Sequence, residues 1–310
     1  MRIEYGEMMT TEQHGTDAVR DAVRDAVRDA VRAGVPGQPV RTVSLIGAGL
    51  DHICYDIDGE LIVRAARRRD PDSLHREVRL LATIAEVSPL PVPRPLFALG
   101  GWCLGYRKLP GIPLLDLPPE TRAAYATPVA GAVGTLLDRL HTTPAIRWAG
   151  LAEADERPLV EWQREAAGYA AGLTAAIPAA HHGSIAGFLA AEPPTDRYSP
   201  VFSHNDLGIE HVLVDPTDGT VTGVIDWSDA ALVDPAADFG VIYRDLGPAA
   251  LDGALRGYSA AAGKELAALR ERARFHGRCR VFEDLAYGIE TGQGRYVAKS
   301  LAALGWLFPA

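Results

Sequence analysis

The sequence predicts an α+β fold, with a small antiparallel N-terminal β lobe that carries one helix and a larger, mainly α-helical C-terminal lobe. Short apolar runs separated by turn signals fill residues 40–65 and 96–109. Helical periodicity dominates the rest of the chain, except for a β-rich island at residues 201–227. Proline and glycine at the end of the first part place a hinge at residues 107–111.

The composition excludes several classes of protein. The chain has 310 residues, of which 47% are hydrophobic and 23% charged, as in globular proteins with a sizeable core. Its net charge of −9 argues against nucleic-acid binding through a basic surface. Residues 1–115 carry 15 basic and 15 acidic side chains, so the whole negative charge lies in residues 116–310. This imbalance favours a cationic ligand for the C-terminal part, or else reflects solvated surface charge.

The sequence also bears on location and assembly. Three widely separated cysteines indicate neither a disulfide framework nor a cysteine zinc site. We see no apolar leader segment and no apolar run of membrane-spanning length. We therefore expect a cytoplasmic protein without a membrane partner, as a monomer or a homodimer.

Residues 1–37 are expected to form a helical extension. Residues 17–32 repeat the tetrapeptide Asp-Ala-Val-Arg four times. Because a strict period of four does not match the 3.6-residue turn, the valines should wind slowly around the helix. Each aspartate can pair with the arginine three residues later. We expect a charged surface helix that ends near Gly34 and has no catalytic part.

Residues 38–109 are predicted to form the N-terminal lobe. Strands are expected at 43–46, 52–57 and 61–63. The first turn between them carries Gly47 and Gly49, and the second is the hairpin signal Asp58-Gly59.

One carboxylate on the helix of this lobe falls on its apolar face. Asp70 and Pro71 mark the helix start, as N-cap and first helical residue. Glu77 lies within the apolar stripe, where a carboxylate needs a cationic partner or a raised pKa. The nearest basic residue by topology is Arg64, at the end of the third strand.

Residues 110–310 are predicted to form the C-terminal lobe. Helices are expected at about 119–141, 158–175, 182–191, 248–262 and 265–291, with a further helix opened by Asp234-Pro235. Within the β-rich island, a polar cluster at residues 203–211 leads into the apolar run 212–214. A turn at 216–219 and a second apolar run then lead to Asp226. This hairpin directs Asp206, His211 and Asp226 toward a common point.

Two kinds of chemistry can use this cluster. In phosphoryl transfer, one carboxylate accepts the proton of an attacking hydroxyl while two other ligands hold Mg²⁺ on nucleotide phosphates. In a hydrolytic metal site, His204, Asp206 and His211 would bind the metal. A third interpretation is structural, in which the polar side chains satisfy the backbone of the loop.

The order of these parts is that of a protein kinase, and three segments sharpen the comparison. The stretches HNDLGIEHVLVD at 204–215, GVIDW at 223–227 and DPAADF at 234–239 closely resemble the aminoglycoside phosphotransferase family. The resemblance covers about residues 40–310. It implies a protein-kinase-like fold and a small-molecule kinase that uses ATP or GTP with Mg²⁺.

The resemblance also implies roles for the catalytic segment. Asp206 matches the catalytic aspartate, and Asp226 matches an aspartate that binds magnesium. His211 stands where most members have a magnesium-binding asparagine, although macrolide kinases show a similar histidine. A neutral imidazole can still bind a divalent metal. His204 and Asp238 match residues that brace the catalytic loop.

In the N-terminal lobe the resemblance implies a nucleotide site. Gly47 and Gly49 match the glycine turn of that site. Arg64 takes the place of the usual phosphate-binding lysine, oriented by Glu77, and residues 1–107 contain no lysine. An arginine fork suits phosphate. The backbone of Arg107 and Leu109 would hydrogen-bond the adenine.

For the substrate, the resemblance implies an acidic cleft to which C-terminal helices contribute. Glu283 and Glu290 fall on one polar helix face, and with Asp229 they are our candidates for contacts with a cationic, hydroxylated molecule of the aminoglycoside type. The alternative interpretation of this face is a solvated surface. Alternative functions are a macrolide or metabolite kinase of the same fold, or a non-catalytic nucleotide-binding regulatory protein.

Overall fold

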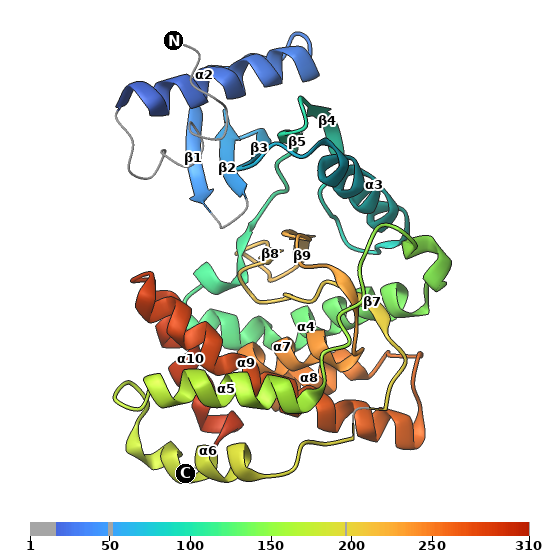
Figure 1. The fold of residues 1–310 in the computed structure, drawn as a ribbon, viewed down its shortest axis with the longest axis vertical. Coiled ribbons are helices and arrows are strands. Elements are labelled where there is room, and N and C mark those ends of the chain that lie inside the picture. Colours follow the sequence, from blue (N-terminus) through green and yellow to red (C-terminus); the bar gives the residue numbers. More distant parts are fainter. Residues whose placement is uncertain (1–16, 49–51, 196, 310) are drawn as a thin grey trace. The chain divides into compact units, whose positions relative to one another are not determined.

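The computed structural model describes residues 17–48, 52–195 and 197–309 and divides into two compact units (Figure 1). The N-terminal unit comprises Met1–Glu86 and Val92–Leu109, and the C-terminal unit comprises Val87–Pro91 and Pro110–Ala310. The chain passes from one unit to the other at residues 86–87, 91–92 and 109–110. The predicted α+β class is confirmed, with a β-rich first unit and a mainly helical second one.

The N-terminal unit contains a five-stranded antiparallel sheet in the order β1-β2-β3-β5-β4. Its elements are β1 (Val43–Ala48), β2 (His52–Ile57), β3 (Leu61–Ala66), α3 (Pro71–Val87), β4 (Pro95–Leu99) and β5 (Cys103–Arg107). Asp58 and Gly59 form the predicted hairpin turn, with φ values of 55° and 75°. The Asp70 carboxylate accepts hydrogen bonds from the backbone of Asp72 and Ser73, which confirms the predicted N-cap of α3.

The repeat helix α2 (Asp17–Gly34) differs from the surface helix that the sequence suggested. Val23, Val27 and Val31 are fully buried and belong to the same apolar core as the strands of the sheet. Three valines four residues apart turn by only about 80° in total on a 100° wheel, so they still share one buried face. Gly34 lies directly against the Phe97 ring, where a Cβ atom would clash. The expected Asp–Arg pairs are present on the exposed side, for example between Asp25 and Arg28.

The C-terminal unit is mainly helical, with short strands (Figure 1). The helices are α4 (Pro119–Thr142), α5 (Leu159–Gly172), α6 (His182–Ala190), α7 (Ala236–Leu246), α8 (Pro248–Leu255), α9 (Gly263–Glu290) and α10 (Gly294–Leu307). Three 3-10 turns lie at Leu114–Asp116, Ala145–Trp148 and Ala179–His181. The strands are β6 (Ile112–Pro113), β7 (Val201–Ser203), β8 (Val212–Val214), β9 (Val221–Val224) and β10 (Ala231–Val233). Helix α8 is shorter than expected, and α10 was not expected. None of the helices in the described part of the chain is long and apolar enough to cross a membrane.

The β8–β9 hairpin determines where the functional residues lie. Val212 pairs with Val224, and the backbone N–H of Ile225 donates to the carbonyl of His211 over 3.0 Å. His211 and Asp226 therefore lie at the same end of the hairpin, as the sequence predicted. Behind it, α7 is buried along most of its length and packs against α9.

Candidate active site

Three predicted residues meet at the end of the β8–β9 hairpin. Nδ1 of His211 lies 3.6 Å from a carboxylate oxygen of Asp206, and its Nε2 lies 3.8 Å from a carboxylate oxygen of Asp226. The His211 imidazole therefore stands between the two carboxylates. Asp226 has a φ of 62°, in the left-handed region that residues with a Cβ rarely adopt, and such strain is concentrated at functional sites.

The tautomer of His211 follows from its hydrogen bond. Nδ1 lies 2.8 Å from the backbone carbonyl oxygen of Asp206, which can only accept, so Nδ1 carries the proton. In the neutral imidazole this leaves the lone pair on Nε2, the nitrogen that faces Asp226. Burial lowers the pKa of His211, but the carboxylates of Asp206, Glu210 and Asp226 outweigh burial and raise it above its ordinary value.

His211 and Asp226 fit a divalent cation as a two-residue donor set. An imidazole nitrogen and a carboxylate oxygen face each other here, and a nucleotide-bound Mg²⁺ takes its other ligands from phosphates and water. No group of three or more His, Cys, Asp or Glu side chains is placed to hold a metal by itself in the residues that the structure describes. The geometry thus suits an ion shared with a ligand and does not suit the predicted alternative, in which His204, Asp206 and His211 bind a metal.

His204 instead braces the loop. Its Nε2 donates to the carbonyl of Ile225 over 2.9 Å, and its Nδ1 accepts the backbone N–H of Asp206 over 3.3 Å. The ring is fully buried and packs against Trp227, with the centroids 4.5 Å apart. Asp206 keeps its side chain accessible, with 39% of it exposed. A rigid, buried neighbour thus supports an accessible carboxylate.

A pocket of about 420 Å³ in the C-terminal unit contains these residues. Of the predicted residues, Asp206, His211, Asp226, Asp229 and Glu283 line it, whereas Glu290 does not. Tyr287, on the same helix face as Glu283, also lines it. The sequence prediction missed the other lining residues: Arg157, Trp162, Glu165, Asn205, Glu210, Arg244, Arg280, Asp284 and Tyr296. The lining thus contains seven carboxylates and three arginines, and it includes no aliphatic side chain.

Burial, together with neighbouring charges, raises the pKa of two predicted substrate contacts. Burial, followed by the charges of Asp206 and Asp226, raises the pKa of Asp229. Partial desolvation raises the pKa of Glu283, with Arg280 opposing and Glu165 adding to the effect. A cation placed among these groups would relieve the repulsion, because a nearby positive charge stabilises the ionised carboxylates.

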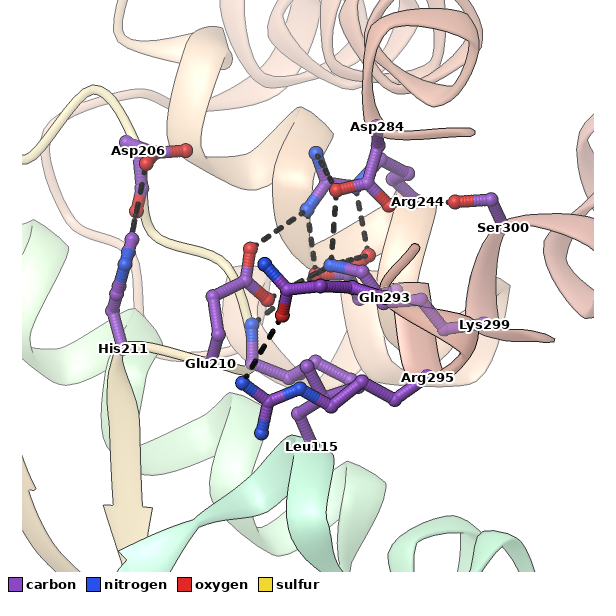
Figure 2. Close-up of polar contacts among 12 residues, drawn as sticks. Leu115, Asp206, Glu210, His211, Arg244, Asp284, Gln293, Arg295, Lys299 and Ser300 are labelled. Atoms are coloured by element: carbon purple, nitrogen blue, oxygen red, sulfur yellow. Dashed lines mark hydrogen bonds and ion pairs between the residues drawn. The ribbon is translucent and has the colours of Figure 1, made fainter. Parts of the chain in front are cut away.

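Five charged residues form what we call the buried charge cluster: Glu210, Arg244, Asp245, Asp284 and Lys299. Glu210, Arg244 and Asp284 also line the pocket, and Figure 2 shows these three together with Lys299. Lys299 of α10 lies 2.8 Å from Glu210, 3.4 Å from Asp245 and 3.3 Å from Asp284. Arg244 of α7 donates to Asp245 over 2.7 Å, and one Asp245 oxygen accepts the backbone N–H of Ile209. Three helices thus meet the catalytic loop through three carboxylates and two cations.

The N-terminal unit contains the predicted ion pair. Nη1 of Arg64 lies 2.6 Å from Oε1 of Glu77, and its Nη2 lies 3.3 Å from Nδ1 of His52. The Arg64 side chain is buried, so both neighbours fix the guanidinium. Gly47 lies in β1 beside an irregularity of the β1–β2 register, and Gly49 lies outside the described residues.

The two residues predicted to bind the adenine come at the end of this unit. Arg107 is the last residue of β5 and pairs with Leu61. Leu109 is the last residue of the unit.

The fold and the site define a kinase-like phosphotransferase: a β unit with a buried Arg–Glu pair, and a helical unit with an Asp-His-Asp hairpin site. Residues 42–276 match the model of the phosphotransferase enzyme family (APH). The chain belongs to this family.

Individual curated proteins are similar to only part of this chain. Viomycin phosphotransferase of Streptomyces vinaceus is 32% identical over 145 residues, which are 45% of this chain and 49% of that protein. The chain matches half or less of the length of its curated relatives.

Solved structures are similar over nearly the whole chain. The GDP and kanamycin complex of APH(2'')-IIIa is 17% identical and covers 90% of this chain and 97% of its own, with a TM-score of 0.64. The macrolide 2'-phosphotransferase of Brachybacterium faecium is 25% identical and covers 92% and 97%, with a TM-score of 0.58. Other solved members hold ATP or ADP.

Proposed function

We propose that this protein transfers the γ-phosphoryl group of ATP or GTP to a hydroxyl of a cationic, polyhydroxylated small molecule of the aminoglycoside type. The observation that carries the proposal is the placement of the Asp206 and Asp226 carboxylates on either side of His211 within one pocket. Membership of a phosphotransferase family supports the same reaction.

In this mechanism Asp206 has a different role from His211 and Asp226. Asp206 accepts a hydrogen bond from the substrate hydroxyl and takes its proton as the bond to phosphorus forms. Nε2 of His211 and the carboxylate of Asp226 would hold Mg²⁺, which neutralises charge on the phosphates when it is bound. His204 keeps the loop in place from behind.

The N-terminal unit supplies the nucleotide contacts. Arg64, held by Glu77, would bind the phosphates through its fixed fork. Gly47 would contact them from β1, and the backbone of Arg107 and Leu109 would bind the adenine.

The pocket lining supports a polycationic substrate over a macrolide. A large lactone needs apolar walls, but no aliphatic residue lines this pocket in the described part of the C-terminal unit. Its carboxylates instead match amino groups. The histidine at position 211 instead favours a macrolide as the substrate, because the macrolide kinases have a similar histidine at this place.

An ADP-release assay with Mg·ATP and Mg·GTP tests the function. The acceptors are kanamycin, viomycin, erythromycin and water. Release with kanamycin or viomycin supports the proposal, and release with erythromycin alone would assign a macrolide kinase. If neither the assay nor a thermal shift with Mg·ATP or Mg·GTP gives a signal, the protein is not a nucleotide-dependent kinase.

Glu283 and Glu290 provide a matched pair for the substrate site. Replacing Glu283 with glutamine removes a charge from the pocket lining and is expected to raise KM for the cationic acceptor by about 10- to 100-fold. Glu290→Gln, seven residues later on α9 and outside the lining, is expected to leave KM unchanged. Equal KM values for both variants and the wild type would remove Glu283 from the substrate site.

Arg64 provides the test of the nucleotide site. Arg64→Gln removes both the charge next to Glu77 and the fork, so kcat/KM for ATP should fall by about tenfold or more. The control is Arg79→Gln, an exposed arginine on the same helix as Glu77. Steady-state kinetics with varied ATP would contradict the assignment if Arg64→Gln behaved like this control.

A further inference from the structure

Asn205, which directly precedes Asp206, has an unusual backbone conformation. Its φ is 65°, in the left-handed region, where asparagine is tolerated better than most residues but less well than glycine. A loop residue held in such a conformation needs support from its surroundings. The direction in which Asp206 leaves the chain depends on this φ value, because the two residues are adjacent.

Two helices supply that support. Nη1 of Arg280, on α9, donates to the backbone carbonyl of Asn205 over 2.7 Å, and its Nη2 donates to the Asn205 side-chain oxygen over 3.0 Å. The backbone N–H of Asn205 donates to Asp238 of α7 over 3.1 Å. Asp238 and Arg280, 33 and 75 positions away in the chain, therefore hold the two peptide groups that flank the Asn205 Cα atom.

Arg280 is itself firmly placed. It is only 8% exposed, and its guanidinium carbon lies 4.8 Å from the centroid of the Trp162 ring. Among the described residues, the oxygens to which its guanidinium donates hydrogen bonds both belong to Asn205. A fork that grips two oxygens of one residue fixes its orientation more strongly than a single point charge does.

We propose that Arg280 is a positioning residue for phosphoryl transfer, which holds Asn205 in the left-handed conformation and thereby sets the direction of the Asp206 carboxylate. This inference rests on the proposed role of Asp206. Arg280 acts through Asn205 and needs no contact with the acceptor. Small errors in the placement of a catalytic group are costly, since a shift of about 1 Å can lower a rate by about 100-fold.

The test uses Arg280→Lys, which keeps the charge and loses the fork, with and without Asn205→Gly. Glycine adopts a positive φ without strain, so it should hold the loop conformation when the fork is missing. We expect Arg280→Lys to lower kcat by about 10- to 100-fold with KM for ATP and acceptor unchanged. Adding Asn205→Gly should recover most of that loss. The acceptor is kanamycin, viomycin or water, whichever the wild type uses.

Two controls separate positioning from other roles. Arg278→Lys alters a neighbouring arginine on α9 that donates to the carbonyl of Leu307, away from the loop, and it should leave kcat unchanged. If the loss in Arg280→Lys appears in KM for the acceptor, Arg280 contacts the substrate and the proposal fails. Wild-type kcat in Arg280→Lys, or no recovery with Asn205→Gly, would also overturn it.

A readout that needs no turnover keeps the inference separate from the proposed function. Amide hydrogen exchange, measured by mass spectrometry on peptides covering residues 201–211, should be about tenfold faster in Arg280→Lys than in the wild type. Asn205→Gly should reverse this change in the same variant. Unchanged exchange in Arg280→Lys would refute the positioning role, whatever the acceptor proves to be. Conversely, faster exchange in a protein that lacks kinase activity would refute only the proposed function.

Discussion

Replacing Asp206 with asparagine is expected to lower kcat for phosphoryl transfer by about 100- to 10,000-fold, the usual contribution of a catalytic acid or base. Asparagine has the same shape as aspartate but cannot accept the proton of the acceptor hydroxyl. The carboxylate is accessible at the pocket, and the backbone of Asp206 keeps its hydrogen bonds to His204 and His211 in the variant. The fold should therefore persist, and nucleotide affinity should change little.

The measurements are single-turnover kinetics with ATP and binding of a non-hydrolysable ATP analogue. Asp218→Asn serves as the control, because Asp218 lies in the β8–β9 turn, where its carboxylate accepts the N–H of Thr220. Its kcat should equal that of the wild type. An Asp206→Asn enzyme that kept its activity within threefold would exclude Asp206 as the proton acceptor.

The largest expected effect on stability comes from Lys299→Met. Lys299 is 4% exposed and is one of two cations that balance three carboxylates in the buried charge cluster. Removing it leaves three carboxylates to share Arg244 in a poorly solvated place, and breaking a buried ion pair typically costs about 3–5 kcal/mol. Urea unfolding should show a midpoint shift of corresponding size, with an unchanged slope.

A compensating variant makes the cause of this loss testable. Adding Asp284→Asn to Lys299→Met restores the net charge of the cluster and should recover part of the stability, because the two residues lie 3.3 Å apart and their effects are not additive. Lys264→Met, at the exposed start of α9, should change the free energy of unfolding by less than about 0.5 kcal/mol. Equal losses in the single and double variants would mean that lost packing, and not charge, explains the effect.

Local patterns in the sequence predicted the parts of the structure that depend on near neighbours. Turn residues and alternating apolar runs were enough to predict the strands of the N-terminal unit and the Asp58-Gly59 hairpin. The Arg64–Glu77 ion pair could be predicted because a carboxylate on an apolar helix face requires a cation, and the topology offered one. The β8–β9 hairpin likewise brought His211 and Asp226 together.

The buried charge cluster could not be predicted in this way. Its members come from a loop and three helices, and their partners lie far away in the sequence, so each charge looks like part of a solvated face when its own segment is considered alone. Helix α10 was missed for a related reason, since Lys299 and Ser300 interrupt its apolar stripe although both are buried. A charge within an otherwise apolar stripe, the signal that revealed Glu77, could also have revealed Lys299.

Glu290, one of the predicted substrate contacts, does not line the pocket that Glu283 lines. Glu283 and Glu290 share a helix face because seven residues make nearly two turns, but they are separated by about 10 Å along the axis. Only Glu283 reaches the pocket. Periodicity therefore gives the direction of a side chain from the helix axis, and it does not say which level of the helix a pocket occupies.

Because the repeat helix α2 and parts of the last two helices are buried, the ends of this chain cannot be trimmed without removing buried side chains. The segment shared with the phosphotransferase family, residues 42–276, leaves out helix α2, the end of α9 and all of α10. Trimming to it would strip Val23, Val27 and Val31 from the core of the first unit. It would also cut α9 before Arg280 and discard Lys299, and with them the support of the catalytic loop. Domain boundaries drawn from the shared segment alone would thus expose part of the first unit's core and remove hydrogen bonds to the loop that contains Asp206.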